Sequence, residues 1–557
     1  MSLAIEFAPI DRFGLGAFAL KALAERPHPA HLGVFMPRSA AEIAPPPEVD
    51  GALLERAELV AALADRTRAR LEPRADAAVH EGIAASLGRL ALEGTSVVVC
   101  GQQPGFLGGP LLDALKTLHT IRLARELERA FARPVVPLFW NHGDDHDANE
   151  VQGVHLVNRN FDVAKVGLAS FGASRRALSH RPVEREAQHL AAVGAHLGEL
   201  FLAGPRAQRI LDLLMPRDGE TLVAARTRSW LELFGAHGLL VLEPDGLRAA
   251  HGRALARLVL AHPGAQLAAA NARLQPVADR VPALDPDRLP PLLFHLADGE
   301  RRAARPLPTG GWRLDGEDDG AERTDEELAA TVQAAPSAWS AGALLRPLVQ
   351  DMLLPVAAYV GGPGELGYHT RLLELRRSNG VQNTPFVLRV SGAVTTADLR
   401  DSAARLDVAI ADYLRDPLPL TPKKTHKSTP LVIQTLEDTA RRHRAELLEL
   451  RTALGEIEPG LAHNLRRAAT NGEEMVLKIT SKALKIASNQ LGKGRRHERR
   501  LAAYLAPLGR PQERVLGLAC FLAAAGEDWL AELLGEMDPF PTEGMLIHLD
   551  DLPGPRP

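Results

Sequence analysis

Acid–base side chains gather in one short run, Asp144, Asp145, His146 and Asp147, which follows the apolar segment 134–140. A histidine flanked by carboxylates suits a general base, because a carboxylate partner fixes its tautomer and raises its pKa. The same groups suit the binding of a substrate amine. Carboxylate oxygens also suit Mg²⁺, and aspartate is common in turns and at helix N-termini. We choose Asp145, His146 and Asp147 as candidate catalytic residues and Asp144 as a candidate ligand contact, and we assign no metal ligand.

A glycine-rich loop, residues 100–110 (CGQQPGFLGGP), lies between the β-branched segment 95–100 and an amphipathic segment over 111–131. Its glycines would let the backbone approach a ligand, and free N–H groups at the start of the helix would attract a carboxylate or phosphate. The loop has neither the GK[ST] of a Walker A motif nor the GxGxxG pattern. A purely structural turn is the alternative. The candidate ligand contacts are Gly101, Gln102, Gln103, Gly105, Gly108 and Gly109.

A third segment, residues 344–369, again runs from an apolar stretch into glycines. Arg346 and Gln350 are four residues apart, so on a helix they share one face. Arginine suits bidentate contact with a carboxylate or phosphate, and the alternative is an arginine on a solvated helix face. The candidate ligand contacts of this segment are Arg346, Gln350, Gly361, Gly362, Gly364 and Glu365.

The elements that must position these residues follow a strand–helix alternation. The helix expected over 111–131 separates two apolar strands, which predicts a βαβ unit and a parallel sheet covered on both faces. In such α/β sheets, ligands bind where the carboxyl ends of strands lie. We therefore predict one parallel sheet assembled from separated pieces. Its predicted strands lie within segments 96–100, 134–140, 151–157, 238–246, 353–365 and 383–391.

The length of 557 residues is too great for a single ordinary core. We expect an α/β protein with a parallel-sheet core, connecting insertions and an α-helical coiled-coil domain. The predicted parts are a helical lead-in over 1–90, a core over 91–400 with insertions at about 161–235 and 265–340, a helical coiled-coil domain over 401–510, and a C-terminal segment over 511–557 that packs back on the core.

The coiled coil is predicted from apolar residues that alternate at spacings of three and four, as in a heptad seam. Pro459 and the stretch 469–474 interrupt the pattern, which favours paired shorter helices over one rod. A narrow seam needs a partner, either the other helix or a second subunit, and we favour a homodimer. The seam residues are Leu447, Leu450, Leu454, Ile457 and Leu461, followed by Val476, Ile479, Ala483, Ile486 and Gln490.

The composition of the chain limits its expected partners and its expected cellular compartment. The net charge of −4 gives no basic footprint for nucleic acid. No apolar run approaches the roughly 20 residues of a membrane span, and the N-terminal segment lacks the features of an export signal. Cys100 and Cys520 are the only cysteines, which excludes a disulfide framework and a zinc site built from cysteines. We therefore expect a cytoplasmic protein with no membrane or nucleic-acid partner.

Three motifs together resemble the BshC family, the cysteine ligases of bacillithiol biosynthesis. They are VVVCGQQPGFLGGPLLDALK, PVVPLFWNHGDDHDANEV and LLRPLVQDMLLPVAAYVGGPGE, and the tail LAPLGRPQERVLG fits as well. The resemblance spans essentially the whole chain. It implies a Rossmann-like core related to class I synthetase-type nucleotidyltransferases and a coiled-coil domain that supports dimers. The implied reaction joins the carboxyl of cysteine to the amine of glucosaminyl-malate, the last step of bacillithiol synthesis.

The resemblance also implies roles for the three segments. A carboxylate must be activated before an amine attacks it. The implied cosubstrate is therefore ATP with Mg²⁺, which would activate the carboxylate as an acyl-adenylate. No tightly bound cofactor is implied. The loop 101–109 would hold phosphate or carboxylate charge. Asp145 or His146 would receive the proton of the attacking ammonium, and Asp147 would orient it. Arg346 would neutralise the malate carboxylates or a phosphate.

The chain departs from the family pattern at a few positions. Gly108 stands where the family usually has threonine, and Asp144 where it commonly has glutamate. Ala341 and Gly342 replace a Pro–Asn pair, and Leu388 replaces the proline of a Pro–Arg pair.

The sequence alone leaves two other functions open. One is a non-catalytic nucleotide- or metabolite-binding protein of the same fold, and the other is a Mg²⁺-dependent hydrolase that uses the run 144–147.

Overall fold

The computed structural model describes most of the chain. The residues outside the description are 1–2, 29–30, 50, 74, 159, 169–170, 172–173, 184–193, 195–204, 279–280, 282–283, 285–288, 298, 308–309, 317–321, 418–428, 451–452, 454–457, 490–495 and 550–557. Residues 1–397 and 504–557 form one compact unit, and residues 398–503 form a second.

Five parallel strands form the central sheet of the first unit, in the order β13–β12–β2–β3–β6. From β2 (Ser96–Gln102) the chain adds β3 (Val135–Asn141) and β6 (Leu240–Leu242) in one direction, and β12 (Val356–Gly361) and β13 (Phe386–Leu388) lie on the other side of β2. The direction therefore reverses between β2 and β12, and such a switch point opens a crevice at the carboxyl ends of the strands. The predicted α/β class with a Rossmann-like parallel sheet is confirmed.

The central strands are buried because their side chains are apolar on both faces. Every residue of β3 is buried, and so is every residue of β2 except its last, Gln102. Helix α4 (Leu111–Phe131) contacts β2, β3 and β12. The helices α2 (Arg56–Arg70), α3 (Ala77–Leu90) and α8 (Leu222–Phe234) pack against β6, and α3 and α8 also contact β3. This cover is what a parallel sheet of nearly continuous apolar strands requires.

The strand expected at 151–157 lies outside the central sheet, so that part of the prediction is wrong. β4 (Gly153–Val157) pairs antiparallel with β5 (Val163–Gly167) in a two-stranded sheet. Only the short helix α5 (Ala148–Val151) separates β4 from β3. A parallel neighbour needs a crossover of a dozen or more residues, so the chain cannot return to the sheet edge there and does so only at β6.

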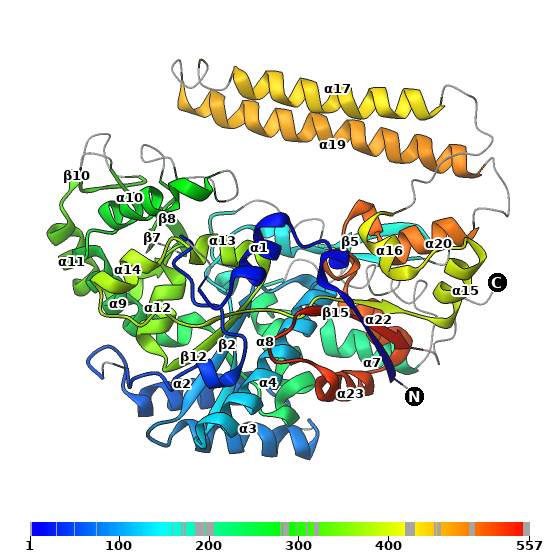
Figure 1. The fold of residues 1–557 in the computed structure, drawn as a ribbon. Helices are drawn as coiled ribbons and strands as arrows, with labels where there is room; N and C mark the ends of the chain where they lie inside the picture. Colours follow the sequence, from blue (N-terminus) through cyan, green and yellow to red (C-terminus); the bar gives the residue numbers. More distant parts are fainter. Residues whose placement is uncertain are drawn as a thin grey trace. The chain divides into compact units, whose positions relative to one another are not determined.

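The segment predicted as a second insertion builds an antiparallel sheet of its own. Its strand order is β10–β9–β8–β7–β11, and α9 packs against β11 and α11. Strand β11 leads into α12 (Arg346–Leu353), which precedes β12. Figure 1 shows these elements in green. Their bounds are α9 (Arg248–Leu260), α10 (Pro263–Leu274), β7 (Leu293–Ala297), β8 (Glu300–Pro306), β9 (Trp312–Leu314), β10 (Glu322–Arg323), α11 (Asp325–Ala334) and β11 (Trp339–Ala341).

The two ends of the first unit meet in a fourth sheet. β1 (Leu3–Pro9) pairs antiparallel with β15 (Glu543–Leu549), and β14 (Gly392–Thr395) pairs parallel with β15. The lead-in expected to be helical thus begins with a strand before α1 (Ala17–Glu25). Further described helices of this unit are α13 (Pro363–His369), α14 (Leu373–Ser378), α21 (Gln512–Val515), α22 (Leu518–Ala525) and α23 (Asp528–Glu536), and α21, α22 and α23 all contact α4.

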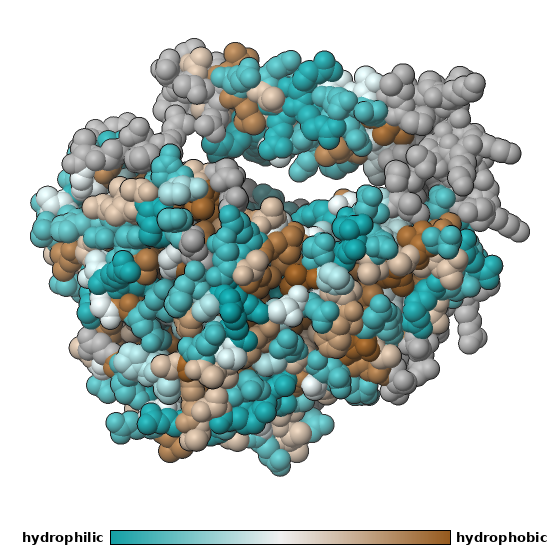
Figure 2. All heavy atoms as spheres, in the orientation of Figure 1, coloured by the Kyte–Doolittle hydropathy of each residue, from teal (hydrophilic) through white to brown (hydrophobic). Residues whose placement is uncertain are grey.

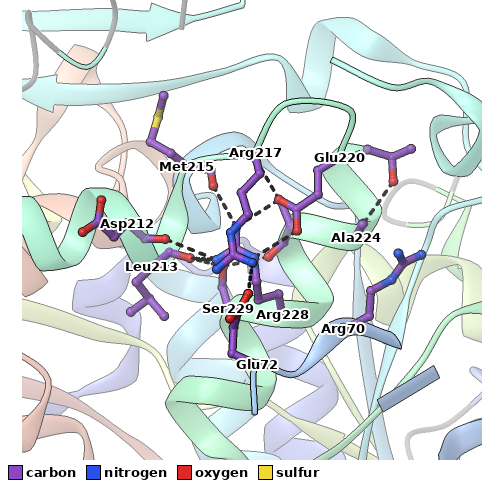
Figure 3. Close-up of polar contacts among 12 residues, drawn as sticks. Arg70, Glu72, Asp212, Leu213, Met215, Arg217, Glu220, Ala224, Arg228 and Ser229 are labelled. Carbon is purple, nitrogen blue, oxygen red and sulfur yellow. Dashed lines mark hydrogen bonds and ion pairs between the residues drawn. The ribbon is translucent and has the colours of Figure 1, made fainter. Parts of the chain in front are cut away.

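A buried arginine joins α7 (Pro205–Leu214) to α8 (Figure 3). The Arg228 guanidinium donates to the carbonyl oxygens of Leu213 at 2.7 Å and Met215 at 2.8 Å. Glu220 accepts from Arg228 Nε and Nη2, both at 3.0 Å. A cation at the carboxyl end of a helix satisfies carbonyl groups that have no partner within the helix and interacts favourably with the helix dipole. The ion pair with Glu220 keeps the buried charge of Arg228 compensated.

The second unit is helical, and its main feature is a pair of long helices, α17 and α19, which lie side by side (Figure 1). Pro459 begins α19, where a proline is tolerated because the first N–H has no helical partner. The stretch 469–474 lies inside α19, so the predicted break there is wrong. The described helices of this unit are α15 (Ala397–Arg405), α16 (Ile410–Arg415), α17 (Thr429–Glu449), α19 (Pro459–Asn489) and α20 (Arg496–Leu505), the first and last of which extend one or two residues beyond it.

The seam between α17 and α19 uses smaller residues than the sequence predicts. Ala440, Ala469 and Thr480 are buried, and an Arg444–Glu473 ion pair of 2.7 Å joins the two helices. Ile479, expected in the seam, is 54% exposed. The heptad is therefore displaced on α19. Leu454, Ile457 and Gln490 lie outside the described residues, as do the side chains of Ala483 and Ile486.

A search of the described helices for a stretch long and apolar enough to cross a bilayer finds none.

We expect Glu513→Gln to lower the free energy of unfolding by about 3 kcal/mol, because the substitution leaves a buried guanidinium without its counter-ion. Glu513 accepts from Arg389 at 2.6 Å and from the backbone N–H of Gly392 at 2.9 Å, and both charged side chains are buried. The measurement is urea denaturation. Glu532→Gln, on the exposed face of α23, is the matched control and should change stability by less than about 0.5 kcal/mol. Equal effects of the two substitutions would contradict the prediction.

Candidate functional site

A cavity of about 210 Å³ lies where the chain leaves the carboxyl end of β3. Four of the residues selected from sequence line it: Asp144, Asp145, His146 and Arg346. The opposite wall comes from the antiparallel sheet of the second insertion and includes Phe294 and Arg301. Two parts of the fold that are distant in sequence therefore share one site.

Asp144 is held by an arginine behind the cavity. Arg248, at the start of α9, donates to both carboxylate oxygens, with an Nη1–Oδ2 distance of 2.8 Å. Burial raises the pKa of Asp144, but the Arg248 charge outweighs it and holds the pKa at about 2. Asp144 is therefore ionised and already paired, so its carboxylate helps to place Arg248 beside the cavity.

Asp145 connects the acidic run to the glycine loop. Its Oδ2 accepts from Gln103 Nε2 at 2.6 Å, and its Oδ1 accepts from the backbone N–H groups of His146 at 2.7 Å and Asp147 at 3.2 Å. Burial alone would raise the pKa of Asp145, but these hydrogen bonds and the charge of Arg301 lower it. The carboxylate is thus an ionised anchor that fixes the loop 145–147.

His146 faces an arginine that the sequence did not single out. Arg301, on β8, places Nη1 3.0 Å from His146 Nδ1 and 3.7 Å from Asp145 Oδ1. Burial and the positive charge of Arg301 lower the pKa of His146. The imidazole is therefore neutral near pH 7, with one ring nitrogen occupied by a protein donor.

Arg346 is the cation of this site with the fewest protein contacts. It begins α12, and its Nη2 lies 3.5 Å from the hydroxyl of Tyr368. Within the described part of the chain it has no carboxylate partner. His142 lines the same cavity, and burial together with the charges of Arg346 and Lys116 keeps the pKa of this histidine well below its usual range. An arginine without a counter-ion beside a neutral histidine favours an anionic ligand.

Other selected residues are used for structure. Gln350 is buried, does not line the cavity, and lies 3.4 Å from Asp351 Oδ1. Glu365 accepts from Lys116 Nζ at 2.6 Å, from the backbone N–H of Gly362 at 2.7 Å and from a tyrosine hydroxyl. Both oxygens of Glu365 therefore already have protein donors.

The glycine loop packs inward instead of presenting an open anion cradle. A Cβ on Gly109, whose φ is +67°, would lie 2.5 Å from Asp113 Oδ2 and 2.7 Å from Arg226 Nη2. These two side chains form a buried ion pair of 2.8 Å beneath the loop. Gly105 also approaches Arg226, and Gly108 lies against apolar side chains. The loop is glycine-rich because a buried charge pair fills the space under it.

The start of α4 is also covered. The backbone N–H of Leu111 donates to the carbonyl of Leu516 at 2.9 Å, and the N–H of Leu518 donates to the carbonyl of Gly109 at 3.0 Å. These contacts with the C-terminal segment occupy the position where an anion was expected at the helix N-terminus. Of the loop residues, Gln103 contacts the site through its hydrogen bond to Asp145.

The remaining selected residues lie around the site but not in its lining. Gln102 is half-buried, and its carbonyl accepts from the N–H of His142. Asp147 is exposed and caps α5 through the N–H of Asn149 at 3.0 Å. Cβ atoms at Gly101 and Gly361 would collide with His142 and Phe386, which explains glycine at both positions. Gly364 is exposed with open space around it.

Arg301 and Phe294 were missed because their segment was identified only as an insertion. The dipeptide Asp298–Gly299, which follows the short and mainly apolar run 291–297, is a hairpin signal. That signal predicts the pairing of β7 with β8, but not that this hairpin faces the end of β3. Across the described residues, no group of three or more His, Cys, Asp or Glu side chains is arranged to hold a metal ion.

Comparison with known proteins matches two family models. Residues 51–390 match the N-terminal Rossmann-like domain of bacillithiol biosynthesis BshC, and residues 394–549 match its C-terminal coiled-coil domain. The first model alone covers more than half of the chain. The chain belongs to the BshC family. The family expected from the sequence motifs is thus confirmed.

Relatives with similar sequences align with this chain over most of their length. A protein of Koribacter versatilis is 28% identical over 459 residues, which is 79% of this chain and 82% of the relative. A protein of Shouchella clausii is 28% identical over 477 residues, 83% of this chain and 85% of the relative. Both carry the name "Putative cysteine ligase BshC". The BshC core and coiled coil are therefore both present in this chain.

We expect Gly109→Ala to lower the free energy of unfolding by about 1–3 kcal/mol, because alanine is strained at this positive φ and its Cβ meets the Asp113–Arg226 pair. Gly364→Ala is the matched control, since its Cβ meets open space. That control should be neutral or slightly stabilising, because alanine favours a helix. Urea denaturation of both variants measures the effect. A Gly109→Ala variant as stable as the parent would contradict the packing role of the loop.

Proposed function

We propose that this BshC protein joins the carboxyl group of cysteine to the amine of glucosaminyl-malate in the last step of bacillithiol biosynthesis. The observation that carries the proposal is the cavity in which Arg346, without a carboxylate partner in the described structure, lies with Arg301 beside Asp145 and His146. Such a site suits an anionic substrate held next to groups that handle protons. The name shared by the relatives supports cysteine as one substrate.

The energy for the reaction would come from ATP, with Mg²⁺ as its counter-ion. The cysteine carboxylate attacks the α-phosphate, pyrophosphate leaves, and an acyl-adenylate forms. The free amine then attacks the carbonyl carbon, a C–N bond forms, and the C–O bond to AMP breaks with its electron pair on the phosphate oxygen. Each acceptor amine loses one proton before the attack and one as the amide forms, so a nearby proton acceptor is needed.

The residues of the cavity would divide these tasks. Arg346 would bind a malate carboxylate or a phosphate. Asp145 or His146 would accept the proton, and Asp147 would orient Asp145 through its backbone N–H, which donates at 3.2 Å. The cavity of about 210 Å³ is smaller than the roughly 300–1,000 Å³ of typical ligand pockets. It would therefore hold only the reacting or anionic end of a substrate. The reaction would take place in the cytoplasm, where free cysteines such as Cys100 and Cys520 persist.

The test is incubation of the purified full chain with cysteine, glucosaminyl-malate, ATP and Mg²⁺, with each component omitted in turn. Mass spectrometry should detect the cysteinyl amide, AMP and pyrophosphate only in the complete mixture. We expect Arg346→Met to raise the KM for glucosaminyl-malate by about 10–100-fold, because a charged hydrogen bond is lost.

Arg377→Met is the control for that variant, because Arg377 is exposed at the end of α14 and lies outside the cavity lining. Its KM should match that of the parent. Substrate binding without product would favour a binding protein of the same fold. Metal-dependent hydrolysis of a phosphorylated compound without cysteine would favour a hydrolase. Either result would overturn the ligase proposal.

We also propose that the chain forms a homodimer through α19. Leu461, Met475 and Ile479 are 36%, 62% and 54% exposed. Their spacings of 14 and 4 residues place them on one face of the helix. Figure 2 shows brown hydrophobic residues among teal ones on the surface of the helical pair. A second copy presents the same stripe, so a symmetric contact would cover both.

Met475→Glu should convert the dimer to a monomer, because it places a charge in the apolar contact. Sedimentation velocity measures the change. Arg467→Glu introduces the same side chain at an exposed position on another face of α19 and should leave the dimer intact. A parent protein that is monomeric at every concentration, or a Met475→Glu variant that still dimerises, would refute this interface.

A further inference from the structure

The contact between Arg301 and His146 determines where a proton lies in the site. Arg301 Nη1 is 3.0 Å from His146 Nδ1. A guanidinium carries only N–H donors and has no acceptor. A hydrogen bond at this distance therefore requires a lone pair on His146 Nδ1.

The position of the guanidinium is itself constrained. Arg301 is 7% exposed, and its Cζ lies 3.7 Å from the centre of the Phe294 ring. Its Nη2 donates to the carbonyl of Ala341 at 3.3 Å. Arg301 extends from β8, and its contacts with Phe294 of β7 and Ala341 of β11 thus fix the plane of its guanidinium. Rotation of Arg301 away from His146 would break the stacking or the carbonyl contact.

A lone pair on Nδ1 leaves one protonation state for the ring. The imidazolium has hydrogens on both nitrogens, and the other neutral tautomer has its hydrogen on Nδ1, so neither can accept from Arg301. Four charged groups surround His146. Arg301 lies on β8, Arg175 lies in the first insertion, and Asp145 and Asp147 lie on the same loop as His146. Burial and Arg301 outweigh the two carboxylates and lower the pKa of His146, in agreement with a neutral ring.

We propose that Arg301 is a positioning residue that holds His146 as the neutral tautomer with hydrogen on Nε2, so that His146 donates a hydrogen bond to the ligand and does not act as the base. The identity of the ligand rests on the proposed ligase function, whereas the position of the proton does not. A donor at this place would stabilise negative charge on the substrate oxygen as the amine attacks.

The role of proton acceptor then falls to Asp145. A carboxylate has about four lone-pair sites, and Asp145 uses two on Oδ1 and one on Oδ2 for the protein donors described above. Oδ2 therefore retains one lone pair, on a side chain that lines the cavity and is 29% exposed. Asp145 and His146 thus divide into an acceptor and a donor, and Arg301 sets the division.

The direct test is ¹⁵N NMR of the full chain labelled at its histidine rings, with the His146 signals identified by their loss in His146→Gln. Near pH 7 we expect an unprotonated Nδ1 and a protonated Nε2. In Arg301→Met the titration midpoint of His146 should move upward and the single tautomer should be lost, whereas Arg301→Lys should retain the parent pattern. Arg302→Met, at the next position of β8, is the control with the same change of charge and should leave His146 unchanged. Hydrogen on Nδ1 in the parent, or an Arg301→Met spectrum equal to the parent, would overturn the proposal.

Kinetics supply an independent readout once ligation is measured. Glutamine can place an amide N–H near the position of Nε2, so His146→Gln should retain activity within about tenfold of the parent. His146→Ala should lose about 100-fold or more, as when one donor to a developing oxyanion is removed. Activity retained by His146→Glu but not by His146→Gln would identify a base and refute the donor role. Because the NMR experiment needs no turnover, it decides the position of the proton even if the ligase proposal fails.

Discussion

The ion pair between the buried Lys116 and the half-buried Glu365 is the constraint on which the site depends. Lys116 lies in the first half of α4, and its side chain is 1% exposed. Its Nζ donates to Glu365 at 2.6 Å and to the carbonyl of Gly101 at 2.8 Å. It thereby ties the end of β2 to the helix that follows β12, across the point where the strand order reverses. Removing the charge of Glu365 would leave the ammonium group of Lys116 buried without its counter-ion. Gly101 and Gln103, and through them Asp145, take their positions from this junction.

Charge compensation decides which groups remain available to a ligand. Arg248 neutralises Asp144, and backbone and amide donors fix Asp145. Within the part of the chain that the structure describes, the Arg346 guanidinium makes only a long contact with a tyrosine hydroxyl. The cavity therefore combines carboxylates that are already held with a cation that is not, which is the reason it suits an anionic substrate. The same arrangement explains why an acidic run can surround a site that attracts negative charge.

The second insertion contributes chemistry as well as cover. Its sheet supplies Arg301 and Phe294 to the wall opposite the acidic run, and Arg301 determines the protonation of His146. A site shared between the parallel sheet and an inserted antiparallel sheet depends on how these two elements dock. Reactive residues at strand ends can thus be tuned by a segment that carries no recognisable motif.

The sequence by itself determined the parallel strands, helix α4, the family and the three segments near the site, because apolar periodicity and the motifs of β2, β3 and β12 are local properties of the chain. It selected Asp145, His146 and Arg346, which the structure brings together. Only the tertiary structure decided that the loop glycines pack over Asp113 and Arg226, that residues 516–518 cover the start of α4, and that Arg301 reaches His146. These outcomes depend on contacts between residues more than 100 positions apart. Local patterns do not encode such contacts, because they arise only when separate elements pack against one another.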